Sequence, residues 1–210
     1  MTLSPHFAKK LARRKPLAID PNRPFAVKRN THEWILDANP DAFSTALNDL
    51  LTQPNAQFGP LRVKRMPGRE GKPFEIGERF TGSLSGWWPD WLADSLFSDF
   101  AELVEVSPRR VVYRYLSGCP MAGSSTFEVD DDERGCRFRV IFEYQEISAL
   151  AVTILHRFGL RMHDEITREQ VERAAEKIGA RILASTLQGP TGGTGIAPQV
   201  VPDARMSASK

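Results

Sequence analysis

The sequence predicts an α+β domain in which a curved antiparallel sheet packs against one long C-terminal helix. The stretch CRFRVIFEY, residues 136–144, alternates apolar and polar side chains with the period of two that is typical of a half-buried strand. The stretch ITREQVERAAEKIGARIL, residues 166–183, has the periodicity of an amphipathic helix. Its apolar stripe consists of Val171, Ala174, Ala175, Ile178 and Ile182. The two alanines let the helix lie close to a curved surface, which we take to be the concave face of the sheet.

Seven strands are expected, and most follow one another with short turns. Their ranges are 25–36, 61–66, 74–82, 101–106, 110–117, 124–129 and 136–144. The acidic loop 130–135 between the last two strands lacks the spaced ligands of a calcium loop, so we read it as a solvated hairpin turn. Strands joined by short turns pair antiparallel, because parallel strands need a long crossover connection.

Three helices are expected in the folded part of the chain. The first follows the turn DANPD, residues 37–41, in which Asn39 or Asp41 can serve as the N-cap beside a proline in the first turn. An inserted helix is expected between mid-chain strands, over residues 89–100. The last helix is expected over residues 167–187, because TREQ at its start is a capping-box pattern.

Composition divides the chain into three parts. Residues 1–23 carry a cluster of lysines and arginines without an apolar run, and we expect a flexible basic arm that can touch an anionic membrane or RNA or simply remain solvated. Residues 24–188 hold all the periodic segments and form the folded domain. Residues 189–210 are rich in Gly, Pro and Ser without periodicity, which predicts a disordered tail.

Several classes of function are disfavoured by composition and spacing. A formal net charge of +2 is too small to indicate a nucleic-acid partner, and no run of about 18 apolar residues suggests a transmembrane segment. Cys119 and Cys136 lack zinc-finger spacing, and we read them as reduced thiols of a cytoplasmic protein. His156, His163 and Asp164 are the only close metal-like grouping, but a third strong ligand is missing. No cofactor fingerprint is present, so neither metal nor cofactor is expected.

The order of these elements resembles the START-like superfamily, also called SRPBCC or helix-grip proteins, which includes polyketide cyclases and birch-pollen-allergen-like proteins. The residues that carry the resemblance are the segment WILDANPDAF, residues 34–43, the strand 136–144 and the helix 167–187. The resemblance implies a cavity between the sheet and the last helix that binds lipids, polyketides or other apolar molecules. Some members are cyclases or dehydratases, and others are interaction modules with closed cavities.

On this resemblance, a small apolar ligand is the expected partner, and its site is lined by inward-facing side chains. The predicted lining residues are Trp34, Phe74, Ile76, Glu78, Phe80, Trp88, Tyr113, Tyr115, Phe138, Val140, Phe142 and Ile178. Trp88 belongs to a tryptophan cluster that can stack on a flat ligand or pack a loop onto the body. Ordinary core packing is the alternative for most of the others.

Glu78 is the one candidate catalytic residue. It is the odd carboxylate on an otherwise apolar strand face, where burial would raise its pKa and suit it to acid–base work. The alternative is a salt bridge with an arginine, or a strand-edge bulge that turns it to solvent. Three functions therefore remain: a carrier of an apolar ligand, a cyclase- or aromatase-type enzyme, and an interaction module with a collapsed cavity.

Overall fold

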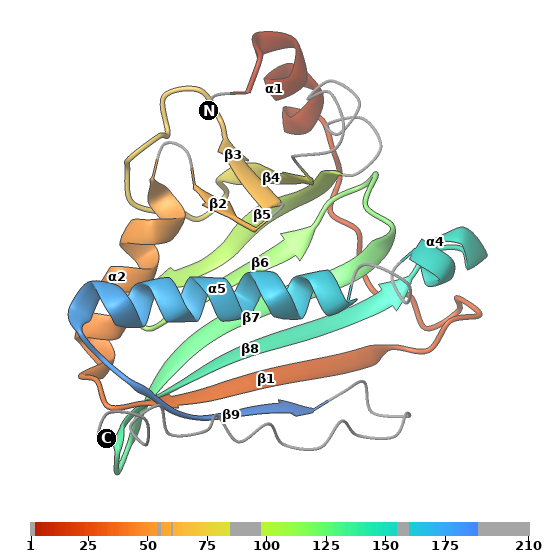
Figure 1. Ribbon diagram of the computed structural model, residues 1–210. Coiled ribbons are helices and arrows are strands. Elements are labelled where there is room, and N and C mark those ends of the chain that lie inside the picture. Colours follow the sequence, from red (N-terminus) through yellow and green to blue (C-terminus); the bar gives the residue numbers. More distant parts are fainter. Residues whose placement is uncertain (1–2, 54–55, 60, 85–97, 155–159, 189–210) are drawn as a thin grey trace.

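A single antiparallel sheet crossed by a long helix makes up the centre of the molecule (Figure 1). The computed structural model describes residues 3–53, 56–59, 61–84, 98–154 and 160–188. The strands are β1 (Lys28–Leu36), β2 (Gln57–Phe58), β3 (Leu61–Arg65), β4 (Arg79–Leu84), β5 (Ser98–Ser107), β6 (Arg110–Tyr115), β7 (Met121–Asp132), β8 (Gly135–Glu146) and β9 (Ile182–Gln188). Their order in the sheet is β2-β3-β4-β5-β6-β7-β8-β1-β9. The predicted fold class, a curved antiparallel sheet holding a C-terminal helix, is confirmed.

The helices lie on the sheet or beside its ends. They are α1 (Pro5–Ala12), α2 (Pro40–Thr52), α4 (Ala149–Ile154) and α5 (Leu160–Ile178). Helix α5 runs across the strands on one face, and α2 packs beside its C-terminal end (Figure 1). The predicted cap of α2 is present, because Asn39 Oδ1 accepts hydrogen bonds from the N–H groups of Asp41 and Ala42 at 2.9 and 3.1 Å.

The last helix ends earlier than the sequence pattern suggested. Gly179 has φ +67°, and the N–H of Ala180 donates to the carbonyl of Ala175 at 2.9 Å, which closes the helix in a Schellman motif. The expected helix over 167–187 is therefore wrong after Ile178, and residues 182–188 instead form β9 on the free edge of β1. Thr167 is not its N-cap either, since its hydroxyl donates to the carbonyl of His163 inside α5.

Two mid-chain predictions also change. The strand expected over 74–82 begins only at Arg79, because residues 74–78 form a turn at the end of the loop after β3. The inserted helix expected over 89–100 falls largely on residues 85–97, which lie outside the described residues. Its last part is not helical, since β5 begins at Ser98. The acidic loop is the predicted hairpin turn, in which Asp132 pairs with Gly135.

Residues 3–23, expected as a flexible arm, pack on the sheet instead. Leu11 of helix α1 and Leu3, which precedes the helix, are buried against the body of the protein. Arg79, which lies on the opposite sheet face from Phe80, donates to the carbonyl of Ala12 at 2.6 Å and so satisfies the C-terminal end of the helix. Arg14 lies 3.5 Å above the centroid of the Phe100 ring. The basic segment therefore also contributes apolar side chains to the core, which its high charge did not predict. The predicted tail 189–210 lies outside the described residues.

Candidate ligand-binding site

The middle and C-terminal parts of α5 cover a filled core. Trp34 and Phe138 face each other in the β1–β8 register with ring centroids 5.6 Å apart, and Phe43 of α2 packs on Phe138 at 5.5 Å. Val171 and Ala174 of α5 belong to the same buried cluster. Three residues predicted to line a cavity, Trp34, Phe138 and Val140, are almost completely buried in this cluster. Here the space between sheet and helix is occupied by protein side chains.

A row of aromatic rings crosses the helix-facing side of the sheet, and Phe127 joins it to that core, with ring centroids 5.8 Å from Tyr113 and 6.1 Å from Phe138. Phe80 on β4 contacts Tyr113 on β6 at 5.4 Å between centroids, Tyr113 contacts Tyr115 at 5.8 Å, and Tyr115 contacts Phe142 on β8 at 5.8 Å. We call these four residues the aromatic row. Phe80 and Tyr113 remain partly exposed, whereas Tyr115 and Phe142 are buried. The sequence predicted all four as lining residues, and the fold places them in one continuous series.

Five polar residues from β1, β8 and α5 gather at the Phe142 end of the aromatic row, and we call them the polar cluster. They are Asn30, His32, Tyr144, His163 and Asp164. The ring of Phe142 stacks on Tyr144 at 4.4 Å and on His163 at 5.1 Å. Asn30 is the register partner of Phe142 on β1, and His32 follows two residues later on the same face. The charge of Asp164 acts on His32, which links the two sides of the cluster.

The polar cluster contains buried atoms for which the described part of the chain supplies no hydrogen-bond partner. They are Asn30 Oδ1, His32 Nδ1, Tyr144 Oη, His163 Nδ1 and Asp164 Oδ1. His163 Nδ1 and Asp164 Oδ1 are 3.8 Å apart, which is too far for a hydrogen bond. Asn30 is 4% exposed and Tyr144 is fully buried. Buried polar atoms in proteins are nearly always paired, so each of these atoms is one that water or a ligand can complete, and the side chains of His163 and Asp164 are 23% and 24% exposed.

Burial sets the charge state of His32 and Tyr144. Desolvation is the main cause that lowers the pKa of His32 to about 4. The charge of Asp164 raises this pKa by a smaller amount, and the charges of His163 and Arg168 lower it slightly. The imidazole is therefore neutral at pH 7. Its Nε2 lies 3.1 Å from Ser185 Oγ on β9. Burial, and next the charge of Glu146, raises the pKa of Tyr144 to about 12, so its phenol keeps the proton.

Lowering the pH from 7 to 5 is expected to destabilise the protein through His32. In the unfolded chain histidine has a pKa near 6.5, so below that pH the unfolded state takes up the proton first and the folded state loses stability. Allowing for partial exposure of the ring, the loss is about 1–2 kcal/mol between pH 7 and 5, and no contribution is expected above pH 7. Denaturant unfolding at both pH values should show a smaller loss for His32→Gln than for the parent. His6→Gln, at an exposed position of α1, is the control. Equal losses of stability in the parent and in His32→Gln would contradict the assignment of the pH dependence to His32.

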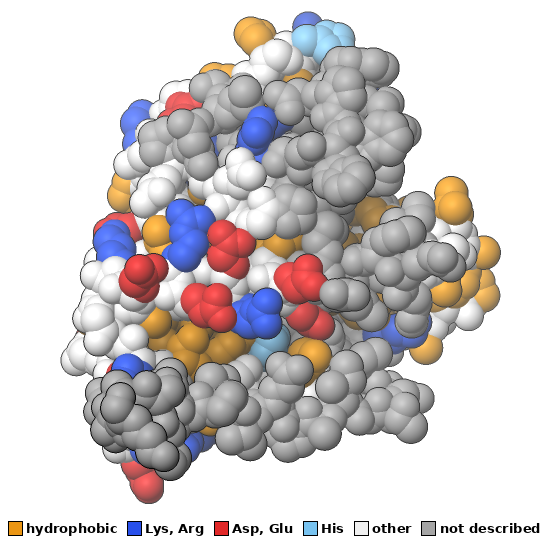
Figure 2. Space-filling view, in the orientation of Figure 1, with side chains coloured by type: hydrophobic (Ala, Val, Ile, Leu, Met, Phe, Trp, Pro, Cys, Tyr) orange, Lys and Arg blue, Asp and Glu red, His pale blue; other side chains and the backbone are white. Residues whose placement is uncertain are grey.

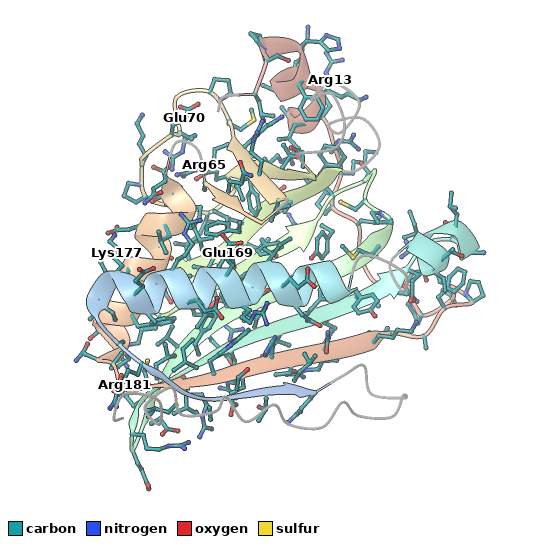
Figure 3. The ribbon with its side chains drawn as sticks, viewed as in Figure 1. Arg13, Arg65, Glu70, Glu169, Lys177 and Arg181 are labelled. Carbon is teal, nitrogen blue, oxygen red and sulfur yellow. The ribbon has the colours of Figure 1, made fainter. Side chains whose placement is uncertain are left out.

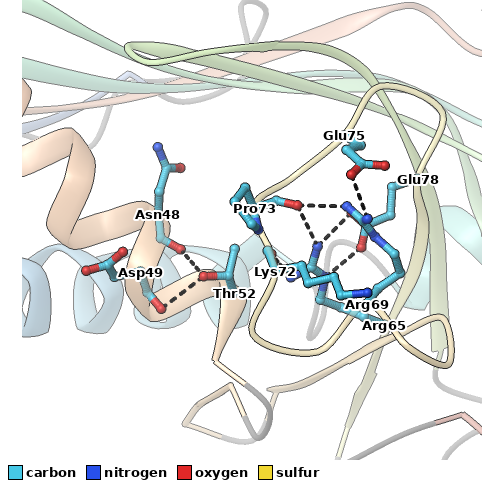
Figure 4. Close-up of polar contacts among 9 residues, drawn as sticks. All are labelled: Asn48, Asp49, Thr52, Arg65, Arg69, Lys72, Pro73, Glu75 and Glu78. Atoms are coloured by element: carbon cyan, nitrogen blue, oxygen red, sulfur yellow. Dashed lines mark hydrogen bonds and ion pairs between the residues drawn. The ribbon is translucent and has the colours of Figure 1, made fainter.

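The segment with Phe74, Ile76 and Glu78 precedes β4 and adjoins the Phe80 end of the aromatic row, since Arg65, which pairs with Glu78, is the register partner of Phe80. Glu78 is buried, and both of its carboxylate oxygens accept hydrogen bonds from Arg65 at 2.5 and 2.7 Å, while Arg69 reaches one of them at 3.2 Å (Figure 4). This is the salt-bridge alternative, and it leaves the carboxylate poorly placed for acid–base work. Phe74 lies under the Arg65 guanidinium at 4.9 Å. Ile76 is 68% exposed, so its prediction as a lining residue is wrong.

The other two predicted lining residues do not join the aromatic row. Trp88 lies outside the described residues. Ile178 packs at the far end of α5, where with Lys177 it borders an open surface depression of about 350 Å³ between α5 and α2. Lys177 lies beside α2, with its Nζ 2.8 Å from Asp49 (Figure 3). This depression lies on the outside of the helix pair and does not belong to the aromatic row.

Figure 2 shows charged side chains along the outer side of α5, with hydrophobic side chains and one histidine between α5 and the β1–β9 edge. Among the described residues, no group of three or more His, Cys, Asp or Glu side chains could hold a metal ion. None of the described helices is long and apolar enough to cross a membrane.

Comparison with known proteins shows the fold. No family model and no curated protein sequence matches the chain. A point mutant of norcoclaurine synthase from Thalictrum flavum, solved with a transition state analogue, is similar at a TM-score of 0.50 and 14% identity, over 75% of this chain and 99% of that one. The di-domain ARO/CYC protein StfQ of the steffimycin biosynthetic pathway gives 0.52 and 14%, over 73% of this chain and 52% of its own. This chain thus spans about half of StfQ. The chain has the START-like, helix-grip fold.

Proposed function

We propose that the protein binds a small hydrophobic molecule, such as a lipid or polyketide, between the sheet and the N-terminal half of α5. The observation that carries this proposal is the aromatic row, which begins partly exposed at Phe80 and Tyr113 and ends beside unpaired buried polar atoms. Small-molecule sites have this composition, a mostly apolar lining with a few polar groups that fix orientation. Because side chains fill the core under the rest of α5, the partly exposed end of the aromatic row, at Phe80 and Tyr113, is the region that best supports this proposal.

A fluorescent apolar probe tests this directly. N-phenyl-1-naphthylamine should bind the native protein saturably with one-to-one stoichiometry, because the aromatic row offers flat apolar surface in one continuous series. Tyr113→Ser removes the central ring and should weaken binding about tenfold, as expected for the loss of one aromatic contact surface.

Ile76→Ser is the matched control, since it also removes a large apolar side chain but from an exposed loop position. It should leave the dissociation constant unchanged. Weak, non-saturating fluorescence with the parent protein would contradict a ligand site and favour an interaction module with a filled interior. Native mass spectrometry of freshly purified protein adds an independent readout, the mass of any molecule that co-purifies.

A cyclase- or aromatase-type enzyme is the second candidate. Glu78 no longer supports it, because Arg65 and Arg69 occupy that carboxylate. The polar cluster gives it little support, because pKa values of about 4 for His32 and about 12 for Tyr144 lie far from the neutral pH at which proton exchange would be needed. Conversion separates the two candidates: a carrier returns a co-purified molecule unchanged after incubation, whereas an enzyme alters its mass or absorbance.

A further inference from the structure

We propose that the protein docks on the surface of an anionic phospholipid bilayer through helix α1 and the turn that follows it. The docking surface consists of Lys9, Lys10, Arg13 and Lys15, and we call these four residues the basic face. Helix α1 lies at one end of the molecule, beyond β3 and β4 (Figure 1). The basic face is on the outer side of this helix, so docking through it does not depend on the proposed ligand site.

Charge is unevenly distributed along the chain. Residues 1–23 contain six of the 28 lysines and arginines and one of the 26 aspartates and glutamates, so the remaining residues carry a net negative charge. On the sheet, cations and carboxylates are paired, as where Arg79 and Arg114 both contact Glu102. The described part of the chain supplies no acidic partner to any side chain of the basic face. A block of cations without counter-ions is typical of a surface that binds an anionic partner.

The fold turns the basic face outward and fixes the backbone that carries it. All four of its side chains are exposed, whereas Leu11 on the other side of α1 is completely buried. Arg79 donates to the carbonyls of Leu11 and Ala12 at 3.2 and 2.6 Å, which holds the end of the helix on the sheet. Beyond the helix, the N–H of Ser117 donates to the carbonyl of Lys15 at 2.7 Å. Cations on a fixed backbone lose less conformational freedom on binding than cations on a flexible arm.

A lipid surface fits the basic face better than a nucleic acid does. Proteins that bind single-stranded nucleic acids combine a basic groove several nucleotides long with exposed aromatic rings on which the bases stack. From Lys9 to Arg13 the basic face extends only about one turn along the helix axis. The aromatic ring of α1, that of Phe7, packs on Phe100 with centroids 6.0 Å apart. A bilayer requires only that several cations lie together on one exposed surface, which α1 provides.

Docking in this way would bring lipid close to the aromatic row. Leu11 of α1 belongs to the same buried cluster as Tyr115 and Phe142, and Tyr113 packs against that cluster. The apolar side of α1 therefore contacts the part of the sheet on which the aromatic row lies, while its basic face meets the membrane surface. A molecule taken from the bilayer would have a short path to the row.

Vesicle co-sedimentation at pH 7 tests the proposal. The parent protein should bind vesicles of phosphatidylcholine that contain about 30% phosphatidylserine at about 0.1 M salt, because anionic lipid attracts each nearby lysine or arginine by about a fivefold factor. Binding should be at least about tenfold weaker to pure phosphatidylcholine, and also at about 0.5 M salt, where the attraction is screened. No binding of the parent to the anionic vesicles, or equal binding to both kinds of vesicle, overturns the proposal.

Two double variants locate the effect. Lys9→Gln with Lys10→Gln should weaken binding to the anionic vesicles about 25-fold, two factors of about five, and glutamine has a helix propensity close to that of lysine. Arg134→Gln with Arg168→Gln is the matched control, since it also lowers the formal net charge from +2 to 0 but on the hairpin turn after β7 and on α5, where both side chains are exposed. It should change binding less than about threefold. Equal losses in the two double variants would mean that only net charge matters, and would overturn the assignment to α1.

A nucleic-acid partner is the competing outcome, and fluorescence anisotropy with a single-stranded RNA oligonucleotide measures it. Tighter binding to this RNA than to the anionic vesicles, lost in Lys9→Gln with Lys10→Gln, overturns the membrane proposal. The same double variant should bind N-phenyl-1-naphthylamine with the affinity of the parent. Failure of vesicle docking and failure of the ligand site are therefore measured separately.

Discussion

Val171→Asp is expected to unfold the protein or to lower its melting temperature by about 10 °C or more. Val171 is completely buried in the core between α5 and the sheet, in one cluster with Trp34 and Phe138. The substitution removes apolar burial and places an unpaired carboxylate among aromatic rings, which together cost about 4 kcal/mol or more. That is a large part of the stability of an ordinary domain. Circular dichroism melting and denaturant unfolding measure the effect.

Glu172→Asp provides the control for this variant. It introduces the same residue one position later on α5, where the side chain is 56% exposed and forms only a long ion pair with Arg168. A small loss from the lower helix propensity of Asp is expected there. If Val171→Asp melted within a few degrees of the parent, α5 would not be packed on the sheet as the structure shows.

The alternation of apolar residues was sufficient to predict most of the sheet. In β8 the even-numbered residues Cys136 to Tyr144 are buried and the residues between them are partly exposed, as the period of two requires. The end of α5 could not be predicted in the same way, because Ile182 continues the helical spacing of the apolar stripe. What ends the helix is Gly179 and the pairing of β9 with β1, a contact distant in sequence. Local periodicity carries no information about such a pairing.

The site was only half predictable for a similar reason. The aromatic row consists of inward positions on predicted strands, and pattern alone selected them. The polar cluster joins Asn30 and His32 with His163 and Asp164, which meet only when β1 lies beside α5. The sequence drew attention to His163 and Asp164 only through their metal-like spacing. The β1 residues of the polar cluster, Asn30 and His32, are distant in sequence, and no motif around them indicated a site. Glu78 shows the converse: the apolar strand face expected around it is absent, since β4 begins only at Arg79 and Ile76 is exposed, whereas the salt bridge with an arginine, the stated alternative, is present.

The ion pair around Glu78 is the second place where a single substitution should have a large effect. The Arg65 guanidinium donates to both carboxylate oxygens of Glu78 and to the carbonyl of Lys72 at 2.6 Å (Figure 4). It also lies over the ring of Phe74. The Arg65 and Glu78 side chains are each 3% exposed. Removing one partner of such a pair leaves a buried charge without its main counter-ion, which costs more than the intact pair contributes.

Arg65→Met is therefore expected to lower the free energy of unfolding by about 3 kcal/mol, within the range for a broken buried pair, with Arg69 at 3.2 Å supplying partial compensation. Adding Glu78→Leu to this variant should restore part of the loss, because the orphaned charge is then gone. Arg110→Met is the matched control, since Arg110 also binds two carboxylates but is 42% exposed, and it should cost less than about 1 kcal/mol. Denaturant unfolding of the three variants measures these differences.

If Arg65→Met cost no more than Arg110→Met, or if the double variant were less stable than the single one, the loop before β4 would not depend on this pair. The burial of Glu78 would then need another explanation, and its carboxylate would again be a candidate for acid–base work.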